Sequence, residues 1–329
     1  YKFVSSVSGS NVVLTRNEDY WGELPAIKDV TMTIITDEST AVSRMETGEA
    51  DFMPNISVEQ LSRVENNDSL TFGTSEAAAI YYIGMRAESS VNPIMQEKDF
   101  RIALAKGIDK EGYVEYMMQG YAEVAHSVLG PQIFGYTPEG EEHEIAYDPE
   151  GAKAILDAHP GWADEEILFL VPSTPAYARM GEYFQSSLTE AGFNNIKIET
   201  LDWSAWLTES QTDGRFDISL YGWSNVTRDG TELMEPNFHS VNGQKRFRAT
   251  AEDAALIDGY IDASKTTADT AARTEDLQAC NAILMENAYV QPVYNSTNLF
   301  CYNNAYTNIT RDPGGTFYVM DFQYADAAE

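Results

Sequence analysis

Between residues 167 and 223 the chain alternates strand-like and helix-like segments, and this alternation constrains the fold more than any other feature. The strand-like segments are apolar and rich in branched side chains, and the helix-like ones end near glycine or serine. In chain order we expect a strand at 167–171, a helix at 177–191, a strand at 196–201, a short helix at 204–210 and a strand at 216–223. Strands that alternate with crossover helices are typical of layered sheets, so the pattern predicts an α/β unit.

The segments around this block predict a second folding unit. Apolar strands at 80–85 and 290–295 bracket the block, as connections between two units should. The length of 329 residues also exceeds that of a typical single domain. The other expected elements are strands at 1–7, 12–16, 30–35 and 299–302, helices at 36–45, around 100–104, at 251–264 and 270–287, helices that begin near Ser57, Asp109 and Asp148, and a frayed tail from Asp326.

Charge and cysteine content exclude several classes of function. Acidic residues outnumber basic ones by 52 to 21, which gives a formal net charge of −31. Such a chain repels nucleic acid and anionic membrane surfaces, so we expect neither as a partner. The sequence contains no run near the roughly 18 apolar residues that read as a membrane span. Cys280 lies in an expected helix and Cys301 along the strand after it, so their positions diverge and we predict free thiols.

Five short motifs follow one another along nearly the whole chain. They are LTRNEDYWG at 14–22, ALAKGIDK at 103–110, YDPEGAKAIL at 147–156, FDISLYGW at 216–223 and AYVQPVY at 288–294. Together they resemble the bacterial extracellular solute-binding proteins of family 5, the peptide, nickel and opine class of receptors for ABC importers. The resemblance implies an α/β fold in the form of a two-lobed, periplasmic-binding-protein-like clamp (type II, class C).

The resemblance also implies how the chain divides between the lobes. Residues 1–82 would form part of lobe one, residues 83–296 lobe two, and residues 297–329 a C-terminal return to lobe one. Because the chain opens inside an expected strand, we expect it to be the C-terminal portion of a longer receptor that lacks here the N-terminal half of lobe one. Any membrane anchor would lie in that missing part, and we expect a monomer.

The loops that follow the strands of the α/β block are the candidate binding site, because ligands bind beyond the carboxyl ends of such strands. Three loops qualify, at 172–179, 202–204 and 224–232. The predicted ligand-binding residues are Ser173, Tyr177, Trp203, Trp223, Asn225, Val226, Thr227, Arg228 and Asp229, together with Tyr82. The helix start behind Ser173 could take a carboxylate or phosphate, and ordinary capping by Ser173 or Thr174 is the alternative.

Aromatic side chains near these loops suit apolar or planar parts of a ligand. Trp223 and Trp203 lie at strand ends, whereas Trp206 is expected to pack within its helix. Side chains alternate along a strand, so one of Tyr81 and Tyr82 should face the ligand and the other the core.

The third loop is the most informative about the ligand. Peptide-binding members of the family carry an acid, which holds the ligand's terminal amine, at the position that Val226 occupies here. This departure counts against ordinary recognition of a free peptide N-terminus. Asp229 could substitute for the acid or could shape the turn. Arg228 could pair with a ligand carboxylate or with a neighbouring acid such as Asp229 or Glu232.

Motifs for enzymes, cofactors and metals do not stand out. The chain has no nucleotide-binding glycine pattern, no nucleophile elbow and no HExxH zinc motif, so we expect a non-enzyme without a cofactor. His239 lies near the position where nickel-binding relatives place a histidine, but a lone histidine is rarely a metal ligand, and we predict no metal site.

The leading hypothesis is the substrate-binding component of an ABC importer. It would capture a small solute, peptide-like or related, between two lobes by hinge closure and deliver it to a membrane permease. Its location would be extracytoplasmic, either periplasmic or as a cell-surface lipoprotein. Two alternatives stay open: the ligand-sensing domain of a transcriptional regulator, and a secreted hydrolase that uses paired carboxylates.

Overall fold

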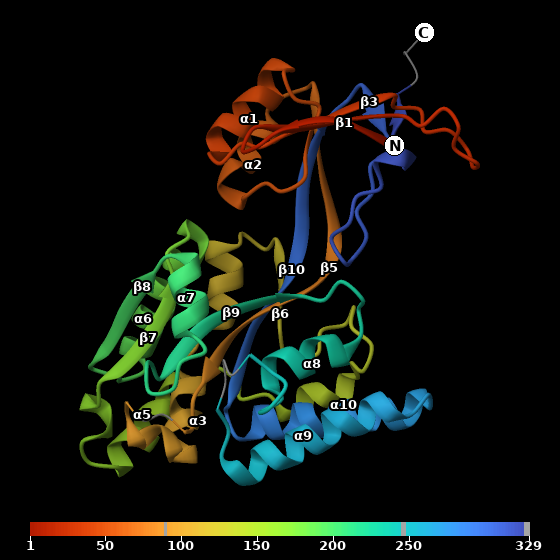
Figure 1. Cartoon of the computed structure of the whole chain (residues 1–329). Helices are drawn as coiled ribbons and strands as arrows, with labels where there is room; N and C mark the ends of the chain where they lie inside the picture. Colours follow the sequence, from red (N-terminus) through yellow and green to blue (C-terminus); the bar gives the residue numbers. More distant parts are fainter. Residues whose placement is uncertain (89–90, 245–247, 326–329) are drawn as a thin grey trace. The chain divides into compact units, whose positions relative to one another are not determined.

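The chain divides into two compact units in the computed structural model, which describes residues 1–88, 91–244 and 248–325 (Figure 1). Unit 1 comprises Tyr1–Ala77 and the chain from Thr297, and unit 2 comprises Ala78–Ser296. The chain passes between the units inside two long strands, β5 (Leu70–Met85) and β10 (Val290–Asn303). The first boundary therefore falls after Ala77, compared with the predicted position after residue 82. The fraying predicted from Asp326 lies outside the described residues.

Unit 2 is built on the predicted alternation of strands and helices. β7 (Ile167–Pro172) pairs in parallel with β8 (Ile196–Leu201) on one side and with β9 (Ile218–Ser224) on the other. β9 in turn pairs with the antiparallel β5, and β6 (Ala122–Val124) pairs with β10. The α/β fold class predicted from the sequence is therefore confirmed.

The helices of unit 2 begin at the capping residues that the sequence offers. Asp148 accepts a hydrogen bond from Gly151 N at the start of α5, and Asp202, Asp229 and Asp269 cap α7, α8 and α10 in the same way. The helices are α3 (Lys98–Lys106), α4 (Lys110–Gly112), α5 (Pro149–Ala158), α6 (Pro175–Glu190), α7 (Trp203–Glu209), α8 (Gly230–Phe238), α9 (Ala251–Thr266) and α10 (Thr270–Glu286). Single turns of 3-10 helix lie at Pro93–Gln96, Pro138–His143 and Trp162–Asp164, and a π-helical turn lies at Tyr113–Met117.

The core of unit 2 lies on both faces of its sheet. Neighbouring residues of β7 belong to different hydrophobic clusters, Phe169 to one and Leu170 to the other. Phe184 of α6 packs in the first cluster, and Leu277 of α10 packs in the second. Because both faces are covered, the strands are nearly continuous apolar runs, and these runs are the signal that the sequence displayed.

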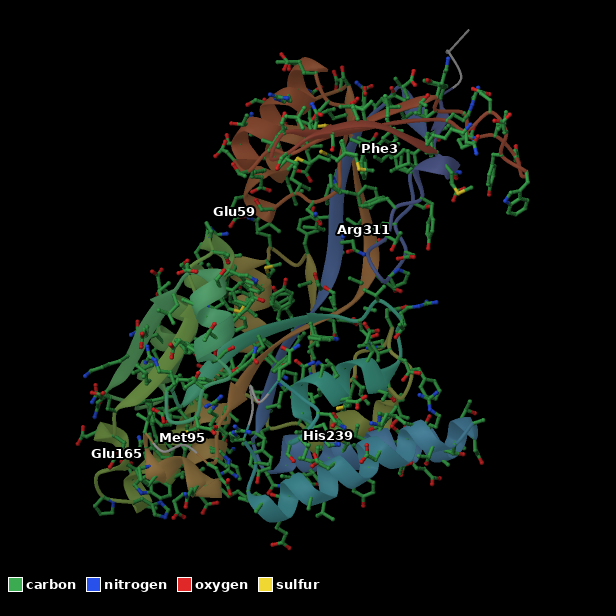
Figure 2. All side chains as sticks on the ribbon, viewed as in Figure 1. Phe3, Glu59, Met95, Glu165, His239 and Arg311 are labelled. Carbon is green, nitrogen blue, oxygen red and sulfur yellow. The ribbon has the colours of Figure 1, made fainter. Side chains whose placement is uncertain are left out.

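Unit 1 is more open. β1 (Lys2–Val7), β2 (Asn11–Thr15) and β3 (Asp29–Thr33) form an antiparallel sheet in which every residue of β1 is exposed, including Phe3 (Figure 2). The other elements are α1 (Glu38–Thr47), β4 (Phe52–Met53), a 3-10 turn at Val58–Gln60, α2 (Leu61–Glu65), β11 (Tyr306–Thr307), a 3-10 turn at Val319–Asp321 and β12 (Gln323–Tyr324). β4 pairs with β10 through Met53 and Cys301.

One local prediction in unit 1 is wrong. The sequence Ser57-Val58-Glu59-Gln60 is typical of a capping box at the start of a short helix. This capping box does not form, and the side chain of Ser57 makes no cap hydrogen bond. Instead the backbone N–H and the hydroxyl of Ser57 both donate to the Glu38 carboxylate, at 2.5 and 2.8 Å. Glu38, which is distant in the sequence, thus takes the place of the local capping partner of Ser57. The helix that follows is a single 3-10 turn continued by the short α2.

The two cysteines are buried free thiols, as predicted. Burial raises the pKa of Cys280 far above its usual value, and it raises the pKa of Cys301 to about 11. Among the described helices, none is long and apolar enough to cross a membrane.

Candidate ligand-binding edge of unit 2

Three parallel strands of unit 2 end at one edge of the sheet. β7 runs into α6, β8 runs into α7, and β9 runs into a loop that we call the post-β9 loop, Asn225–Asp229, before α8 begins (Figure 1). The predicted loops therefore share the carboxyl edge where α/β sheets bind ligands.

A connected set of aromatic rings, here called the aromatic row, follows this edge; it consists of Tyr294, Tyr81, Tyr177, Trp203 and Trp206. Tyr81 stacks on Tyr294 with ring centroids 4.5 Å apart, and it lies 5.8 Å from Tyr177. Tyr177 lies 6.3 Å from Trp203, which stacks on Trp206 at 5.0 Å. Trp203 is 47% exposed, so the row presents aromatic surface to solvent.

Gly222 allows the rings to approach the sheet. A Cβ atom at this position would lie 2.6 Å from Tyr177 Oη and 2.9 Å from a ring carbon of Tyr81. Gly222 pairs with Tyr81 across β9 and β5, so the two rings cover bare backbone. The glycine of the FDISLYGW motif is therefore a requirement of close packing at this edge.

Tyr81 and Tyr294 of the row are neutral phenols. Burial raises the pKa of Tyr81 above its usual value, and burial together with neighbouring tyrosines raises the pKa of Tyr294 further. The row therefore offers planar apolar surface and carries no negative charge near neutral pH.

The crossing-strand tyrosines divide as alternation predicts, but with Tyr82 on the core side. Tyr82 is 1% exposed, and its hydroxyl donates to Asn237 Oδ1 at 3.0 Å. Tyr81 is partly exposed and belongs to the aromatic row. Tyr81 is thus the accessible member of the pair, which corrects the choice of Tyr82. Trp206 packs in the core as predicted, and its indole N–H donates to Ser219 Oγ at 3.2 Å.

Internal hydrogen bonds fix the polar side chains of the post-β9 loop. Asn225 is buried, and its Nδ2 donates to the Asp229 carbonyl at 2.8 Å. The backbone N–H of Thr227 donates to Glu232 at 2.7 Å, and the Thr227 hydroxyl donates to the same carboxylate. These contacts therefore shape the loop, while the buried Oδ1 of Asn225 has no hydrogen-bond partner among the described residues.

Asp229 is committed to the structure of the loop. Its carboxylate accepts from Thr231 N at 2.9 Å at the start of α8 and from Arg273 Nη2 at 2.8 and 2.9 Å. Partial burial alone would raise the pKa of Asp229, but the hydrogen bonds from Arg273 and Thr231 hold that pKa below its usual value. Of the two roles considered for Asp229, the structure supports shaping the turn.

Val226, Thr227 and Arg228 are the exposed residues of the loop, and of these Thr227 is held by Glu232. Val226 is 62% exposed. Arg228 has a backbone φ of 59°, which places it in the left-handed region at the tip of the turn. Asp229 pairs with Arg273, and Glu232 bonds to Thr227, so among the described residues no ion pair of Arg228 is found. Its guanidinium is thus available to a ligand. Trp223 is half-buried at the end of β9 and packs against the second hydrophobic cluster.

The start of α6 has no side-chain cap among the described residues. Thr174 occupies the N-cap position without a cap hydrogen bond, and Pro175 follows it. Ser173 is exposed, and its backbone N–H donates to the Leu201 carbonyl at 2.7 Å. The capping alternative is therefore absent among the described residues, and the first-turn N–H groups near Tyr177 can donate hydrogen bonds to an anion.

His239 ends α8 and is 5% exposed (Figure 2). Its Nδ1 accepts from the backbone N–H groups of Val241 and Asn242, each at 3.1 Å. In the part of the chain that the structure describes, no group of three or more histidine, cysteine and acidic side chains could hold a metal ion.

Comparisons with known proteins identify the family and the fold of the chain. Residues 1–245 match the family model described as "Bacterial extracellular solute-binding proteins, family 5 Middle", so the chain belongs to this family. Similar solved structures include a dipeptide-binding protein from Pseudoalteromonas sp. SM9913 in complex with Met-Leu (TM-score 0.80, 21% identity). NikA from Brucella suis in complex with Fe(III)-EDTA is also similar (TM-score 0.85, 20% identity). Each alignment covers 98% of this chain, and the two cover 63% and 67% of the other chains. They establish a periplasmic-binding-protein fold.

Curated relatives bind different solutes. Oligopeptide-binding protein AppA of Bacillus subtilis (strain 168) is 25% identical over 69% of this chain and 44% of its own length. Heme-binding protein A of Haemophilus influenzae is 24% identical over 78% of this chain and 47% of its own. The chain therefore spans about half the length of the curated relatives it matches.

Proposed function

We propose that the chain is part of an extracytoplasmic solute-binding receptor that delivers a peptide-like or related solute to an ABC-type membrane permease. The observation that carries the proposal is the partly exposed aromatic row at the carboxyl edge of parallel strands in a family 5 fold. The exposed Arg228, for which no ion pair is found among the described residues, lies in the loop after β9 at the same edge. The family consists of solute-binding proteins and not of enzymes, so capture makes and breaks no covalent bond. No observation favours the regulator or the hydrolase.

Capture would work by hinge closure. The chain passes between its units only inside β5 and β10 among the described residues, and two extended strands are suited to absorb a hinge rotation. The ligand would stabilise the closed form through contacts that the open form lacks, and the permease would bind that closed form. The receptor would act as a monomer.

The side chains of the edge suggest the chemistry of the solute. Arg228 suits a carboxylate, the α6 start beside Ser173 suits a second anionic group, and the aromatic row suits a planar or apolar part. Val226 stands where an acid would hold a free amine. We therefore infer a carboxylate-bearing, peptide-like solute whose amino end is blocked, modified or absent.

Mass spectrometry tests the ligand class directly. The full-length receptor is purified natively and then denatured, and the released small molecules are identified. A stoichiometric carboxylate-bearing solute is the expected result. X-ray scattering before and after addition of that solute should give a smaller radius of gyration, and unchanged dimensions at saturation would contradict hinge closure.

Substitutions test the edge. Trp203→Ala and Arg228→Ala should each weaken binding of the co-purified solute about tenfold or more, because stacking and a charge-assisted hydrogen bond are lost. Lys153→Ala is the matched control, since Lys153 is an exposed cation of α5 that pairs with Glu150. Equal affinities of all three variants would show that this edge of the sheet is not part of the binding site.

Val226→Asp tests the inference about the amine. An acid at this exposed position should raise affinity for the dipeptide Met-Leu about tenfold, while N-acetyl-Met-Leu should gain nothing. No gain for either peptide would show that the post-β9 loop does not contact the amino end of a ligand.

A further inference from the structure

The chain changes unit at two peptide links, Ala77–Ala78 in β5 and Ser296–Thr297 in β10. On the unit 2 side, β6 pairs with β10 up to Ser296, the last residue of the unit. β9 pairs with every residue of β5 in unit 2 except the first. Asn225, directly after β9, donates its backbone N–H to the carbonyl of that first residue, Ala78, at 2.7 Å. Hydrogen bonds between strands of unit 2 therefore reach the boundary on both crossing strands.

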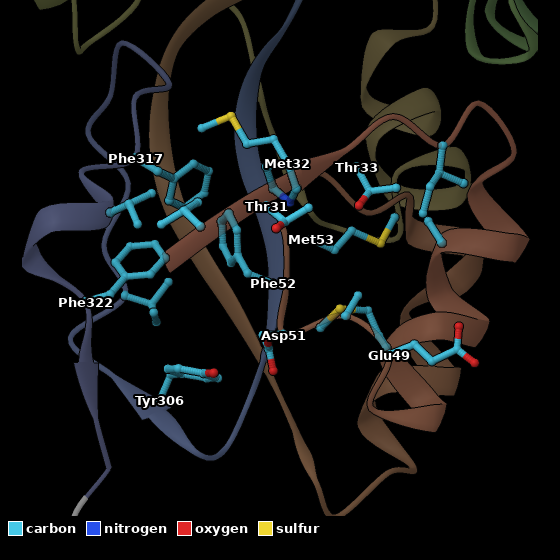
Figure 3. Close-up of a pocket in the computed structure, with 18 of the residues that line it drawn as sticks. Thr31, Met32, Thr33, Glu49, Asp51, Phe52, Met53, Tyr306, Phe317 and Phe322 are labelled. Atoms are coloured by element: carbon cyan, nitrogen blue, oxygen red, sulfur yellow. The ribbon is translucent and has the colours of Figure 1, made fainter. Parts of the chain in front are cut away.

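Unit 1 ties the same two strands together through the side chain of Asn298. This asparagine is 8% exposed, and its Nδ2 donates to the Glu76 carbonyl at 3.1 Å and to Ser75 Oγ at 3.2 Å. Glu76 and Asn298 are each the second residue from the boundary. The groove of about 960 Å³ in this unit takes none of its lining residues from β5 or β10, so packing in the groove does not hold these strand ends (Figure 3). Because both units fix the strands, bending is concentrated at the two links.

The hydrogen bond to Ala78 comes from the loop that carries candidate solute contacts. Asn225 is the first residue of the post-β9 loop, and its Nδ2 donates to the carbonyl of the last residue, Asp229, at 2.8 Å. The Arg228 N–H donates to the Asn225 carbonyl at 3.3 Å. Asn225 thus closes the loop behind its exposed tip, Val226–Arg228, and connects the closed loop to β5.

Contacts with neighbouring elements make the loop rigid. The Phe134 N–H donates to the Arg228 carbonyl at 2.7 Å, and the Phe134 carbonyl accepts from Gly230 N at 2.9 Å. The Arg273 guanidinium holds the Asp229 carboxylate at 2.8 Å. These contacts support the left-handed backbone of Arg228, a conformation that persists only where the surroundings hold it. The tip of the loop therefore has a fixed place relative to the end of β5.

The fold accepts an unfavourable burial at Asn225. The residue is fully buried, and its Oδ1 has no hydrogen-bond partner among the described residues. Burial of an unpaired amide oxygen costs free energy, which an apolar side chain of similar size would avoid. An apolar side chain could not donate to the Asp229 carbonyl, however. The hydrogen bond that closes the loop is therefore what the asparagine contributes.

A rigid loop makes solute binding depend on the hinge. A loop that flexed could follow the solute at every hinge angle, so the open and closed forms would bind it equally and binding would not shift their ratio. We propose that Asn225 is the positioning residue that couples solute contact to closure, because it fixes the Arg228 tip relative to Ala78 at the hinge end of β5. This inference rests on the proposed function.

Titration and X-ray scattering of the full-length receptor test this role. In Asn225→Ala the co-purified solute should bind about tenfold more weakly, and at saturation the radius of gyration should fall by less than about half as much as in the unsubstituted receptor. Contacts that are weakened equally in both forms would raise Kd but leave closure at saturation complete. Full closure of Asn225→Ala would overturn this inference alone. An unsubstituted receptor that does not close would overturn the proposed function together with it.

Asn92→Ala is the matched control. Asn92 is 8% exposed, and its Nδ2 donates to the Glu166 carbonyl at 2.9 Å, at the amino end of β7 and thus at the opposite edge of the sheet. The variant loses a comparable buried hydrogen bond, so its Tm should fall, while its Kd and its closure at saturation should stay unchanged. Incomplete closure of both variants would assign the effect to a general loss of stability and would overturn the inference.

Hydrogen exchange tests the coupling without a substitution, and it decides the question if Asn225→Ala does not fold. Saturation of the unsubstituted receptor with the co-purified solute should slow exchange of the Asn225 amide, which bonds to Ala78, at least about tenfold. The Ile167 amide, which bonds to the Asn195 carbonyl at the amino end of β7, should exchange at the same rate with and without solute. Unchanged exchange at Asn225, or equal slowing of the two amides, would overturn the inference.

Discussion

The two units use their strands in opposite ways. In unit 2, five of the six residues of β7 are buried, and hydrophobic clusters cover both faces of the sheet. In unit 1, all six residues of β1 are exposed, and β3 has one partly buried residue. The helices of unit 2 thus cover the faces of its sheet, whereas the sheet of unit 1 has exposed apolar side chains that another polypeptide could cover. A strand pattern in a sequence therefore reports extended structure, and it does not report whether the chain contains the strand's packing partners.

The largest test of this contrast compares two phenylalanines. Phe184→Ala should destabilise the 329-residue chain by about 4 kcal/mol, because the ring is fully buried in the core of unit 2. Phe3→Ala should change stability by less than about 0.5 kcal/mol, since Phe3 is 66% exposed on β1. Urea unfolding measures both. Similar losses for the two variants would mean that β1 is packed in solution.

A buried ion pair tests how much the internal polar contacts of unit 2 contribute to its stability. Lys110 has a fully buried side chain that pairs with Glu144 and donates to the Ala125 carbonyl at 2.6 Å. Lys110→Met should cost about 3 kcal/mol in unfolding free energy, because the partly buried Glu144 carboxylate loses its ammonium partner and keeps the contact with His126 Nδ1 at 2.9 Å. The double variant Lys110→Met/Glu144→Leu should recover most of this loss. If the double variant recovers none of the lost free energy, the Lys110 ammonium stabilises the protein mainly through its hydrogen bond to the Ala125 carbonyl.

Alanine substitutions at two glycines of unit 2 should change the free energy of unfolding in opposite directions. Gly222→Ala should destabilise by about 1–2 kcal/mol and weaken solute binding, because its Cβ meets Tyr177 and Tyr81. Gly259→Ala, inside α9 with open space around it, should stabilise by about 0.5–1 kcal/mol. Thermal unfolding and titration with the co-purified solute measure the two effects. A Gly222 variant with normal binding would mean that the aromatic row can shift without loss.

The last test of unit 2 is electrostatic. The pKa of Asp229 is depressed in the folded state, so its charge stabilises the protein above its unfolded pKa, near 4, and this contribution is lost as the pH falls through the folded value. Asp229→Asn keeps a capping side chain but loses the charge. It should cost about 1 kcal/mol at pH 7, since the pair with Arg273 is partly exposed. The difference from the unchanged protein should shrink below about pH 4 in urea unfolding, and a constant difference would exclude the ion pair as its cause.

Local patterns predicted the elements of unit 2 well. The strand expected at 196–201 is β8 with the same bounds, because a run of alternating apolar and polar residues between Gly192 and Asp202 has clear ends. The order of the strands could not be predicted, since the pairing of β9 with the antiparallel β5 joins segments more than a hundred residues apart. The failed cap at Ser57 has the same origin, because its N–H is taken by Glu38, 19 residues earlier.

The candidate edge shows the same limit at the level of side chains. The loops could be placed from the strand ends. Which of Tyr81 and Tyr82 is accessible, however, depends on the pairing of β5 with β9, which sets Tyr81 opposite Gly222. The role of Asp229 depends on Arg273, 44 residues further along the chain. Neither contact leaves a signal in the neighbouring sequence. The glycine before Trp223 was the one available clue that rings approach the backbone closely there.

The two buried thiols lie in different units, Cys280 in unit 2 and Cys301 in unit 1. An alkylating reagent attacks the thiolate, and burial keeps both sulfurs protonated and out of reach while their surroundings stay folded. Each unit therefore contains one buried cysteine whose rate of modification can report local opening. The rate at which each cysteine becomes modified in native buffer records how often its own unit opens, without any engineered probe.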